Sequence, residues 1–203
     1  MKRIVLMALL ALALPVAALA GNVDFSNSGG TLTGSSAGLS LTGSELIGVN
    51  GLSGTGPVTG NLGSVAFSTG SFINTVGNTS YFNGGGSFTI TGTGTNGVPS
   101  GAIFTGSFSG QVSMTLVGSA PNGGQIYDLT GPISGTWYNG QTVSGATGQI
   151  YVFTGKNGWM GSSTIGSGDT IIGTSAVPEP GTLGLLGTGL VGLAGVVRKK
   201  LKS

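Results

Sequence analysis

A thirteen-residue alternation of apolar and polar residues limits what this chain can fold into more than any other feature. In the segment IFTGSFSGQVSMTL, each even position from 104 to 116 is apolar or glycine, and each odd position is serine, threonine or glutamine. Side chains alternate between the two faces of a β-strand, so this period of two predicts a strand with one buried face. The segment therefore predicts a sheet protein, although 43 glycines in 203 residues also suit a disordered chain.

The next segment alternates on odd positions, from Tyr127 to Trp137. The dipeptide Asn139-Gly140 follows it and predicts a two-residue type I′ turn, in which Tyr138 pairs with Gln141. With that register the apolar faces of 127–138 and 141–153 coincide, as a hairpin over a core requires. The predicted cross-strand pairs are Trp137–Thr142, Ile133–Ala146, Leu129–Ile150 and Tyr127–Val152.

The same matching of faces predicts a hairpin between 103–117 and 125–138. The predicted pairs are Leu116–Gln125, Met114–Tyr127, Val112–Leu129, Gly110–Gly131, Phe108–Ile133, Gly106–Gly135 and Phe104–Trp137. We therefore expect an antiparallel meander from about 103 to 153. The segment GSFTITGTG is expected to add a neighbouring strand with Phe88 and Ile90 facing inward.

The N-terminal third has a shorter period, and we expect short strands at 23–25, 31–33, 39–42, 46–49 and 64–68. The motif TLTGS at 31–35 recurs as SLTGS at 40–44, but a solenoid needs about three copies or more. Short strands with regular turns predict an all-β fold, an antiparallel β-sandwich or a flattened barrel. A right-handed β-helix is the alternative, because Gly/Ser/Thr repeats also suit stacked coils.

The N-terminus, MKRIVLMALLALALPVAALA, has the three parts of a secretory signal peptide. Lys2 and Arg3 precede an apolar run from 4 to 14, and Ala18 and Ala20 offer a small-residue cleavage site before Gly21. We therefore expect signal peptidase to remove residues 1–20, with export of the chain that follows.

The C-terminus carries a second apolar run, at 182–197, followed by a basic tail. Its 16 uncharged residues would reach roughly 24 Å as a helix, less than the ~30 Å hydrocarbon core. Five glycines within it weaken it further as a helix. The basic residues that follow are expected to stay in the cytoplasm. The run therefore predicts a weak, short transmembrane anchor.

Three features of this tail occur in a fixed order: Pro178-Glu179-Pro180, the apolar run, and the cluster Arg198-Lys199-Lys200. In that order and spacing the tail resembles the PEP-CTERM sorting signal of Gram-negative bacteria. The resemblance implies cleavage by an exosortase, a membrane peptidase, after transient anchoring in the inner membrane. It also implies delivery to the cell surface or extracellular matrix, often alongside exopolysaccharide production.

The predicted organisation is a signal peptide at 1–20, an exported β-rich domain at 21–177 and the sorting signal at 178–203. The exported region has one base, Lys156, against four acids, which gives a net charge of −3. A surface of that sign is unsuited to nucleic acid. The chain has no cysteine or histidine, so we expect no metal site and no cofactor.

No catalytic residue is expected, because the acids lie far apart in sequence and no histidine accompanies the serines. Asp128 is expected on the outer face, and Asp169 in a loop. Tyr138, Tyr151 and Trp159 are the candidates for ligand contact, because outward aromatic rings can stack on sugars. Trp159 is expected in an exposed loop, whereas Trp137 is expected in the core.

Three classes of function are consistent with these features, and an enzyme fits least well. A structural or adhesive surface protein needs only a β-rich fold, an uncharged hydroxyl-rich surface and an export signal. We therefore expect that role. The alternative is a carbohydrate-binding, lectin-like module that acts on exopolysaccharide.

Overall fold

The computed structural model describes residues 21–52, 56–119, 121, 124–154 and 158–174. The predicted signal peptide and the predicted transmembrane run lie outside the described residues. Within the described ranges, no helix is long and apolar enough to cross a membrane.

The described residues form twelve β-strands, and every strand pairing with a stated direction is antiparallel, which confirms the prediction of an all-β antiparallel fold. The strands are β1 (Gly21–Ser28), β2 (Thr31–Ser35), β3 (Gly38–Asn50), β4 (Val58–Ser68), β5 (Phe72–Val76), β6 (Thr79–Phe82), β7 (Gly85–Thr93), β8 (Ser100–Phe108), β9 (Val112–Ser119), β10 (Gln125–Trp137), β11 (Thr142–Thr154) and β12 (Gly161–Thr174).

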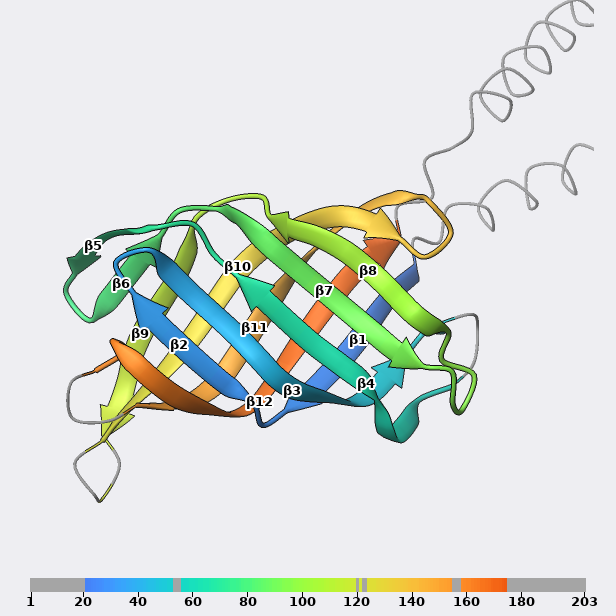
Figure 1. Ribbon diagram of the computed structural model, residues 1–203, viewed down its shortest axis with the longest axis horizontal. Helices are drawn as coiled ribbons and strands as arrows, with labels where there is room; N and C mark the ends of the chain where they lie inside the picture. Colours follow the sequence, from blue (N-terminus) through green and yellow to red (C-terminus); the bar gives the residue numbers. More distant parts are fainter. Residues whose placement is uncertain (1–20, 53–55, 120, 122–123, 155–157, 175–203) are drawn as a thin grey trace, which may run out of the picture. The chain divides into compact units, whose positions relative to one another are not determined.

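Several short strands lie end to end and act as one long strand. On β3, Ser28 of β1 faces Glu45 and Thr31 of β2 faces Thr42, so the register continues from β1 into β2. In the same way β4 continues into β5, β6 into β7, and β8 into β9 along their neighbours. The effective order is therefore a simple meander in chain order, as Figure 1 shows.

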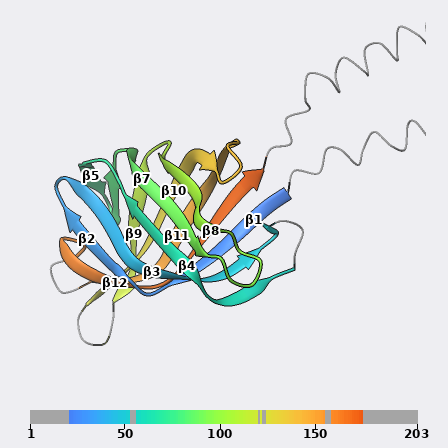
Figure 2. The same ribbon diagram turned by 45° about the vertical axis from the view of Figure 1, so that its right-hand side comes forward.

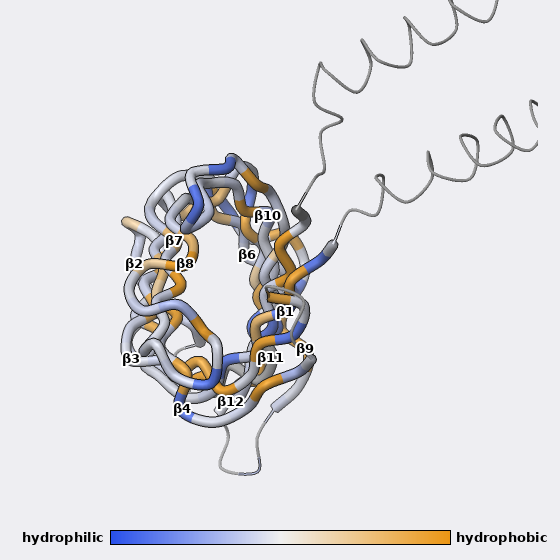
Figure 3. The backbone as a smooth tube through the Cα atoms, turned by 90° about the vertical axis from the view of Figure 1, so that its right-hand side faces the viewer, coloured by the Kyte–Doolittle hydropathy of each residue, from blue (hydrophilic) through white to orange (hydrophobic). Residues whose placement is uncertain are grey.

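The meander closes on itself because β12 pairs with both β11 and β2. The result is a closed ring of strands, which is elongated in cross-section in Figure 3. The alternative of a right-handed β-helix is wrong, because that fold stacks parallel strands and the pairings here are antiparallel.

Apolar side chains from all parts of the meander fill the interior of the strand ring. Phe88 and Ile90 are fully buried, and β7 pairs with β8, as predicted from the sequence. The rings of Phe67 and Phe88 stack with centroids 5.6 Å apart, and Phe108 meets both edge-on. Trp137 is buried as predicted, and its ring meets Phe25 at 5.8 Å.

The predicted turn between β10 and β11 is wrong. Gly140 N–H donates to the Trp137 carbonyl, and Trp137 N–H donates to the Gln141 carbonyl, so the loop has three residues. Gly140 has φ of 87°, whereas Asn139 does not have a positive φ. This is a type I turn followed by a left-handed bulge glycine, and not the type I′ turn expected.

The longer loop moves the register of β11 by one residue. Ile133 pairs with Gly145 rather than Ala146, and Leu129 pairs with Gln149 rather than Ile150. Thr142 pairs with Thr136 rather than with Trp137. Of the four predicted pairs only Tyr127–Val152 is confirmed, and it lies beyond a bulge in this pairing. Because one residue exchanges the two faces of a strand, β11 turns polar side chains into the ring.

The predicted single strand 103–117 is interrupted between β8 and β9. Before the break, the three predicted pairs of Phe108, Gly106 and Phe104 with β10 are confirmed. After it, Met114 pairs with Leu129 and Leu116 with Tyr127, so the pairs predicted for Met114 and Leu116 are wrong by two residues. The predicted pair Val112–Leu129 is also wrong, because Leu129 pairs with Met114. Gly110 lies in the break and does not pair with Gly131.

The N-terminal strands lie close to their predicted positions, with one merger. The predicted strands 39–42 and 46–49 are parts of the single strand β3. Its register on β4 shifts between Leu41 and Ser44, where Gly43 has a positive φ of 68°. The short strands β5 and β6 were not predicted.

The strand ring has two distinct ends. β1 begins and β12 ends at one end, and the two strands are neighbours (Figures 1 and 2). The β5–β6 hairpin lies at the other end. The chain therefore enters and leaves the ring side by side, away from β5.

Candidate functional site on the outer face of β9–β12

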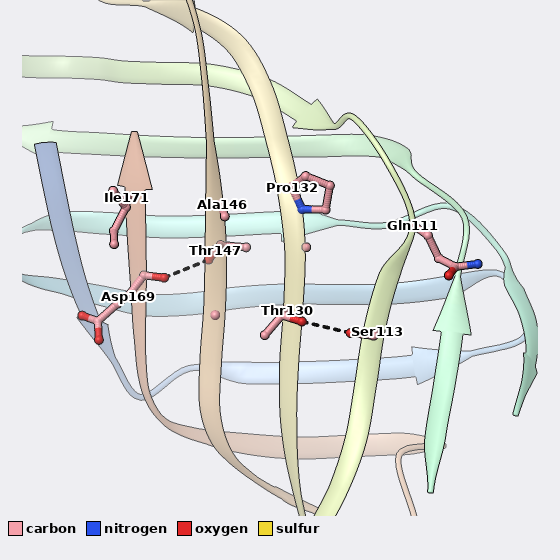
Figure 4. Close-up of a pocket in the computed structure, with 10 residues that line it drawn as sticks. Gln111, Ser113, Thr130, Pro132, Ala146, Thr147, Asp169 and Ile171 are labelled. Atoms are coloured by element: carbon pink, nitrogen blue, oxygen red, sulfur yellow. Dashed lines mark hydrogen bonds between the residues drawn. The ribbon is translucent and has the colours of Figure 1, made fainter. Parts of the chain in front are cut away.

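A hollow runs across the outer face of the ring over β9, β10, β11 and β12, and we call it the outer groove. Its volume is about 530 Å³, and Figure 4 shows the residues around it. The groove is lined by Gln111, Ser113, Thr130, Gly131, Pro132, Ala146, Thr147, Gly148, Asp169 and Ile171.

Small residues on β11 make the floor of the outer groove. Ala146 and Gly148 occupy outward positions there, and a Cβ added to Gly148 would have no neighbour nearer than 3.8 Å. Pro132 on β10 and Ile171 on β12 stand on either side, as Figure 4 shows. The register shift of β11 is what places Ala146 outside rather than in the core.

The polar groups of the outer groove are mostly uncharged. The hydroxyls of Ser113 and Thr130 share a hydrogen bond of 2.9 Å across β9 and β10. The Gln111 side chain lies at one end and the Asp169 carboxylate at the other. The groove therefore offers hydroxyl and amide groups with a single negative charge, which suits a neutral, hydrogen-bonding ligand.

Asp169 lies in strand β12 and is exposed, so the prediction that it lies in a loop is wrong. The pKa of Asp24 on β1 is raised, first by burial of its carboxyl group and second by the charge of Asp169. One carboxylate oxygen of Asp24 and one of Asp128 are buried without a hydrogen-bond partner among the described residues. Within the described part of the chain, no three acidic or histidine side chains gather as metal ligands would.

The three predicted aromatic contacts do not form one site. Tyr138 is 46% exposed, and its ring lies 5.7 Å from that of Trp137. Trp159 is only 8% exposed, so the exposed loop predicted for it is wrong. The two residues precede β11 and β12, which are antiparallel, so they lie at opposite ends of the ring. Tyr151 is in β11, but its side chain is outside the described set.

Trp159 packs at the end of the ring that carries the β5–β6 hairpin. Its ring centroid lies 5.1 Å from that of Phe72 and 5.0 Å from that of Phe82. The indole therefore packs between two strands as part of the core rather than on the surface.

Five buried polar side chains form a cluster inside the ring, and we call it the inner polar cluster: Asn27, Ser44, Thr147, Gln149 and Thr170. Asn27 Nδ2 donates to Ser44 Oγ at 2.8 Å and to Gln149 Oε1 at 2.9 Å. Gln149 Nε2 donates to Thr147 Oγ1 at 3.0 Å, and the Thr147 and Thr170 hydroxyls are 2.8 Å apart. The mutual hydrogen bonds make this cluster a structural element.

Sequence reasoning missed both the outer groove and the inner polar cluster. Serine, threonine and glycine are so frequent here that none of the lining residues stands out. The signal that was available is the alternation in TVSGATGQI, in which Val143, Thr147 and Gln149 share one face. The sorting-signal residues and the signal cleavage residues Ala18 and Ala20 lie outside the described part of the chain.

Comparison with known proteins bears on the C-terminus. Residues 176–199 match the family model of the PEP-CTERM protein-sorting motif. No curated protein and no solved structure was found to match the chain. The chain therefore falls in the class of proteins that carry a C-terminal sorting signal. In particular, it is a PEP-CTERM sorting-domain protein, as the resemblance of its tail predicted.

Proposed function

We propose that this chain is an exported structural or adhesive protein of the cell surface or extracellular matrix. The observation that carries the proposal is the match of 176–199 to the PEP-CTERM motif, directly after a closed ring of strands. The N-terminal signal peptide predicted from the sequence supports the same route. The partners in that route are signal peptidase, the inner membrane as a transient anchor, and an exosortase.

The ends of the strand ring support processing at both termini. The twelve described strands lie between Gly21 and Thr174, and their described partners lie within the same range. Cleavage before Gly21 and cleavage near Pro178 would therefore leave every described strand pair intact. The short tail would then serve as a temporary tether.

The chemistry of the described residues supports a role without catalysis. Asp24 and Asp169 have no described base beside them, and the pKa of Asp24 is raised by burial first and by the Asp169 charge second. The polar side chains that line the outer groove offer hydroxyls, an amide and the single carboxylate of Asp169. A structural or adhesive role needs only the hydroxyl and amide groups that this surface presents.

The test is cell fractionation together with intact-mass measurement. Surface-extracted protein should lack residues 1–20 and the cluster Arg198-Lys199-Lys200. A variant with Pro178-Glu179-Pro180 replaced by three alanines should stay in the inner membrane with its tail attached. Surface protein that still carries 198–203 would contradict the temporary tether, and an unchanged distribution of the triple-alanine variant would contradict the sorting route.

A carbohydrate-binding role is the second candidate, and the outer groove is the observation that favours it. Its uncharged hydroxyl and amide groups suit many weak hydrogen bonds to exopolysaccharide. Tryptophan fluorescence would report poorly on such a ligand, because Trp137 and Trp159 are both buried. Calorimetric titration with host exopolysaccharide is the better measurement.

A blocked groove provides the matched test of this second role. Gly148→Phe places a ring over the open floor, whereas Thr142→Phe places one on the same strand and face but outside the groove. Binding that is lost in Gly148→Phe and kept in Thr142→Phe would support the lectin-like role. Equal binding by both variants, or no binding by the unmodified protein, would contradict it.

A further inference from the structure

Strand β5 ends the sheet path and has a free edge. In the described part of the chain β6 is its strand partner on one side. On the other side, Phe72 N–H donates to the carbonyl of Ser36 in the β2–β3 turn, at 3.1 Å. Beyond that contact β5 continues past the turn for four residues, 73–76, which is roughly 13 Å of strand.

The backbone groups on this free edge are available for pairing. Val76 faces Thr79 across the two-residue loop Gly77–Asn78. In such a hairpin the flanking residues exchange both backbone hydrogen bonds, so the N–H and C=O of the preceding residue, Thr75, point the other way. A strand with unpaired N–H and C=O groups is a template for another strand.

The side chains of this edge do nothing to prevent pairing. Ile73 is 41% exposed and Val76 is 60% exposed, and Asn74 and Thr75 between them are also exposed. The segment SFINTVGNT at 71–79 contains no charge and no proline, which are two of the devices that protect an edge strand. A β-bulge shifts the register of β5 between Phe72 and Asn74, so the regular part of the edge is residues 74–76. That part is exposed and uncharged.

The start of β5 is firmly held, so this edge is preformed. The Phe72 ring lies 5.7 Å from that of Phe82 on β6 and 5.1 Å from that of Trp159. The edge also lies at the end of the ring opposite the start of β1 and the end of β12 (Figure 1). The edge therefore lies away from the point at which the last described strand ends.

We propose that β5 is a self-recognition edge, at which the β5 strands of two copies of this chain pair antiparallel across a two-fold axis. Antiparallel pairing of one strand with its own copy is self-complementary, as a two-fold interface requires. The absence of charge in 71–79 means that two copies bring no like charges together. The proposal extends the structural role by naming its partner, a second copy.

The absence of cysteine from the chain allows a direct test by disulfide trapping. Four single-cysteine variants of the full chain, at Ile73, Asn74, Thr75 and Val76, are expressed in the host and mildly oxidised on intact cells. Copies of a residue at the two-fold axis lie within reach of a disulfide, whereas copies two positions away do not. Disulfide-linked dimers should therefore peak at one position or two adjacent positions.

Ile171→Cys is the matched control, because Ile171 is 48% exposed but lies in a strand paired with β11. At the peak position, the fraction of chain trapped as a dimer should exceed that of this control at least about fivefold. A lysine added at another of the four positions should reduce the trapped fraction by a similar factor, because it brings like charges together. No excess over the control, or equal trapping at all four positions, would overturn the proposal. Trapping to a different protein, seen as a mass other than twice the chain, would also overturn it.

These outcomes are separate from those of the proposed surface role. Trapping reports contact between copies, whereas fractionation and intact mass report where the chain goes and how it is processed. A surface protein that gives no trapped dimer would overturn the β5 proposal alone.

Discussion

Gln149 and Asn27 face each other inside the strand ring, 122 residues apart in sequence, and each amide bonds to the other. Asn27 Nδ2 donates to Gln149 Oε1 at 2.9 Å, and Gln149 Nε2 donates to Asn27 Oδ1 at 3.3 Å. Both side chains are fully buried. The pair therefore joins the first strand of the ring to β11, near the seam where the meander closes.

Asn27→Ala should destabilise the protein by about 2–3 kcal/mol, because it leaves the buried amide of Gln149 and the hydroxyl of Ser44 short of partners. Asn61→Ala is the control, since Asn61 is exposed on β4, and its cost should stay within about 0.5 kcal/mol. Urea unfolding of the purified proteins measures both. Equal midpoints for the two variants would contradict a structural role of the inner polar cluster.

Gly168→Ala should also destabilise, by about 1–3 kcal/mol, because the added methyl group would overlap the Gln149 side chain. The three nearest atoms to that methyl group all belong to Gln149, the most distant being Nε2 at 2.6 Å. The same substitution should therefore cost much less in a Gln149→Ala background. A double-mutant cycle measures this coupling.

The control for that cycle is Gly148→Ala, on the outer face of β11. A methyl group there would have its nearest neighbour, Thr130 Cγ2, at 3.8 Å, so the change should cost no more than about 0.5 kcal/mol. Additive effects of the Gly168 and Gln149 changes would show that the predicted overlap does not occur.

The sequence predicted which face of a strand is buried better than it predicted which residues pair across strands. The pairing of β8 and β9 with β10 shows why. The break between β8 and β9 moves the pairing with β10 by two residues, as Met114–Leu129 shows. A shift of two keeps every side chain on its face. Phe104, Phe108 and Met114 are therefore all buried, as the alternation predicted, although the pairs after the break differ.

The hairpin between β10 and β11 shows the limit of the same reasoning. Asn-Gly suits a two-residue loop, but here the glycine closes a three-residue loop, and this odd change exchanges the faces of β11. The inner polar cluster and the outer groove both result from that exchange. The alternation in TVSGATGQI was a signal for both, but the Asn-Gly dipeptide could not decide between loops of two and three residues, because that choice depends on the fit of whole strands.

Phe108→Ala should cost roughly 3–5 kcal/mol, because its ring is buried against Phe67 and Phe88. Ser109→Ala is the neighbouring control. Ser109 is exposed, and its backbone N–H donates to the Pro132 carbonyl, a bond that alanine keeps, so its effect should stay within about 0.5 kcal/mol. Denaturant melts compare them, and similar losses would contradict the described end of β8.

Trp159→Ala separates a core role from a ligand-contact role for this residue. Because the indole packs on Phe72 and Phe82, truncation should lower the free energy of unfolding by about 3–5 kcal/mol. Tyr138→Ala, which removes an exposed ring, should change stability far less. A Trp159→Ala protein of unchanged stability would contradict the burial and return Trp159 to the ligand-contact candidates.

The pH dependence of stability should carry a small contribution from Asp24. Its pKa in the folded protein is raised above the ordinary value of 3.8, by burial first and by the Asp169 charge second. The folded state therefore favours protonated Asp24, and the stability this gives is present at low pH and is lost as pH rises from 3.8 through the raised pKa.

Asp24→Asn should thus stabilise the protein at pH 7 relative to the unmodified chain, with the advantage disappearing below pH 3.8. Asp169→Asn should reproduce part of the gain, because it removes the second cause. Thermal melts between pH 3 and pH 7 measure both, and an Asp24→Asn protein that loses stability at pH 7 would reverse the sign of this argument.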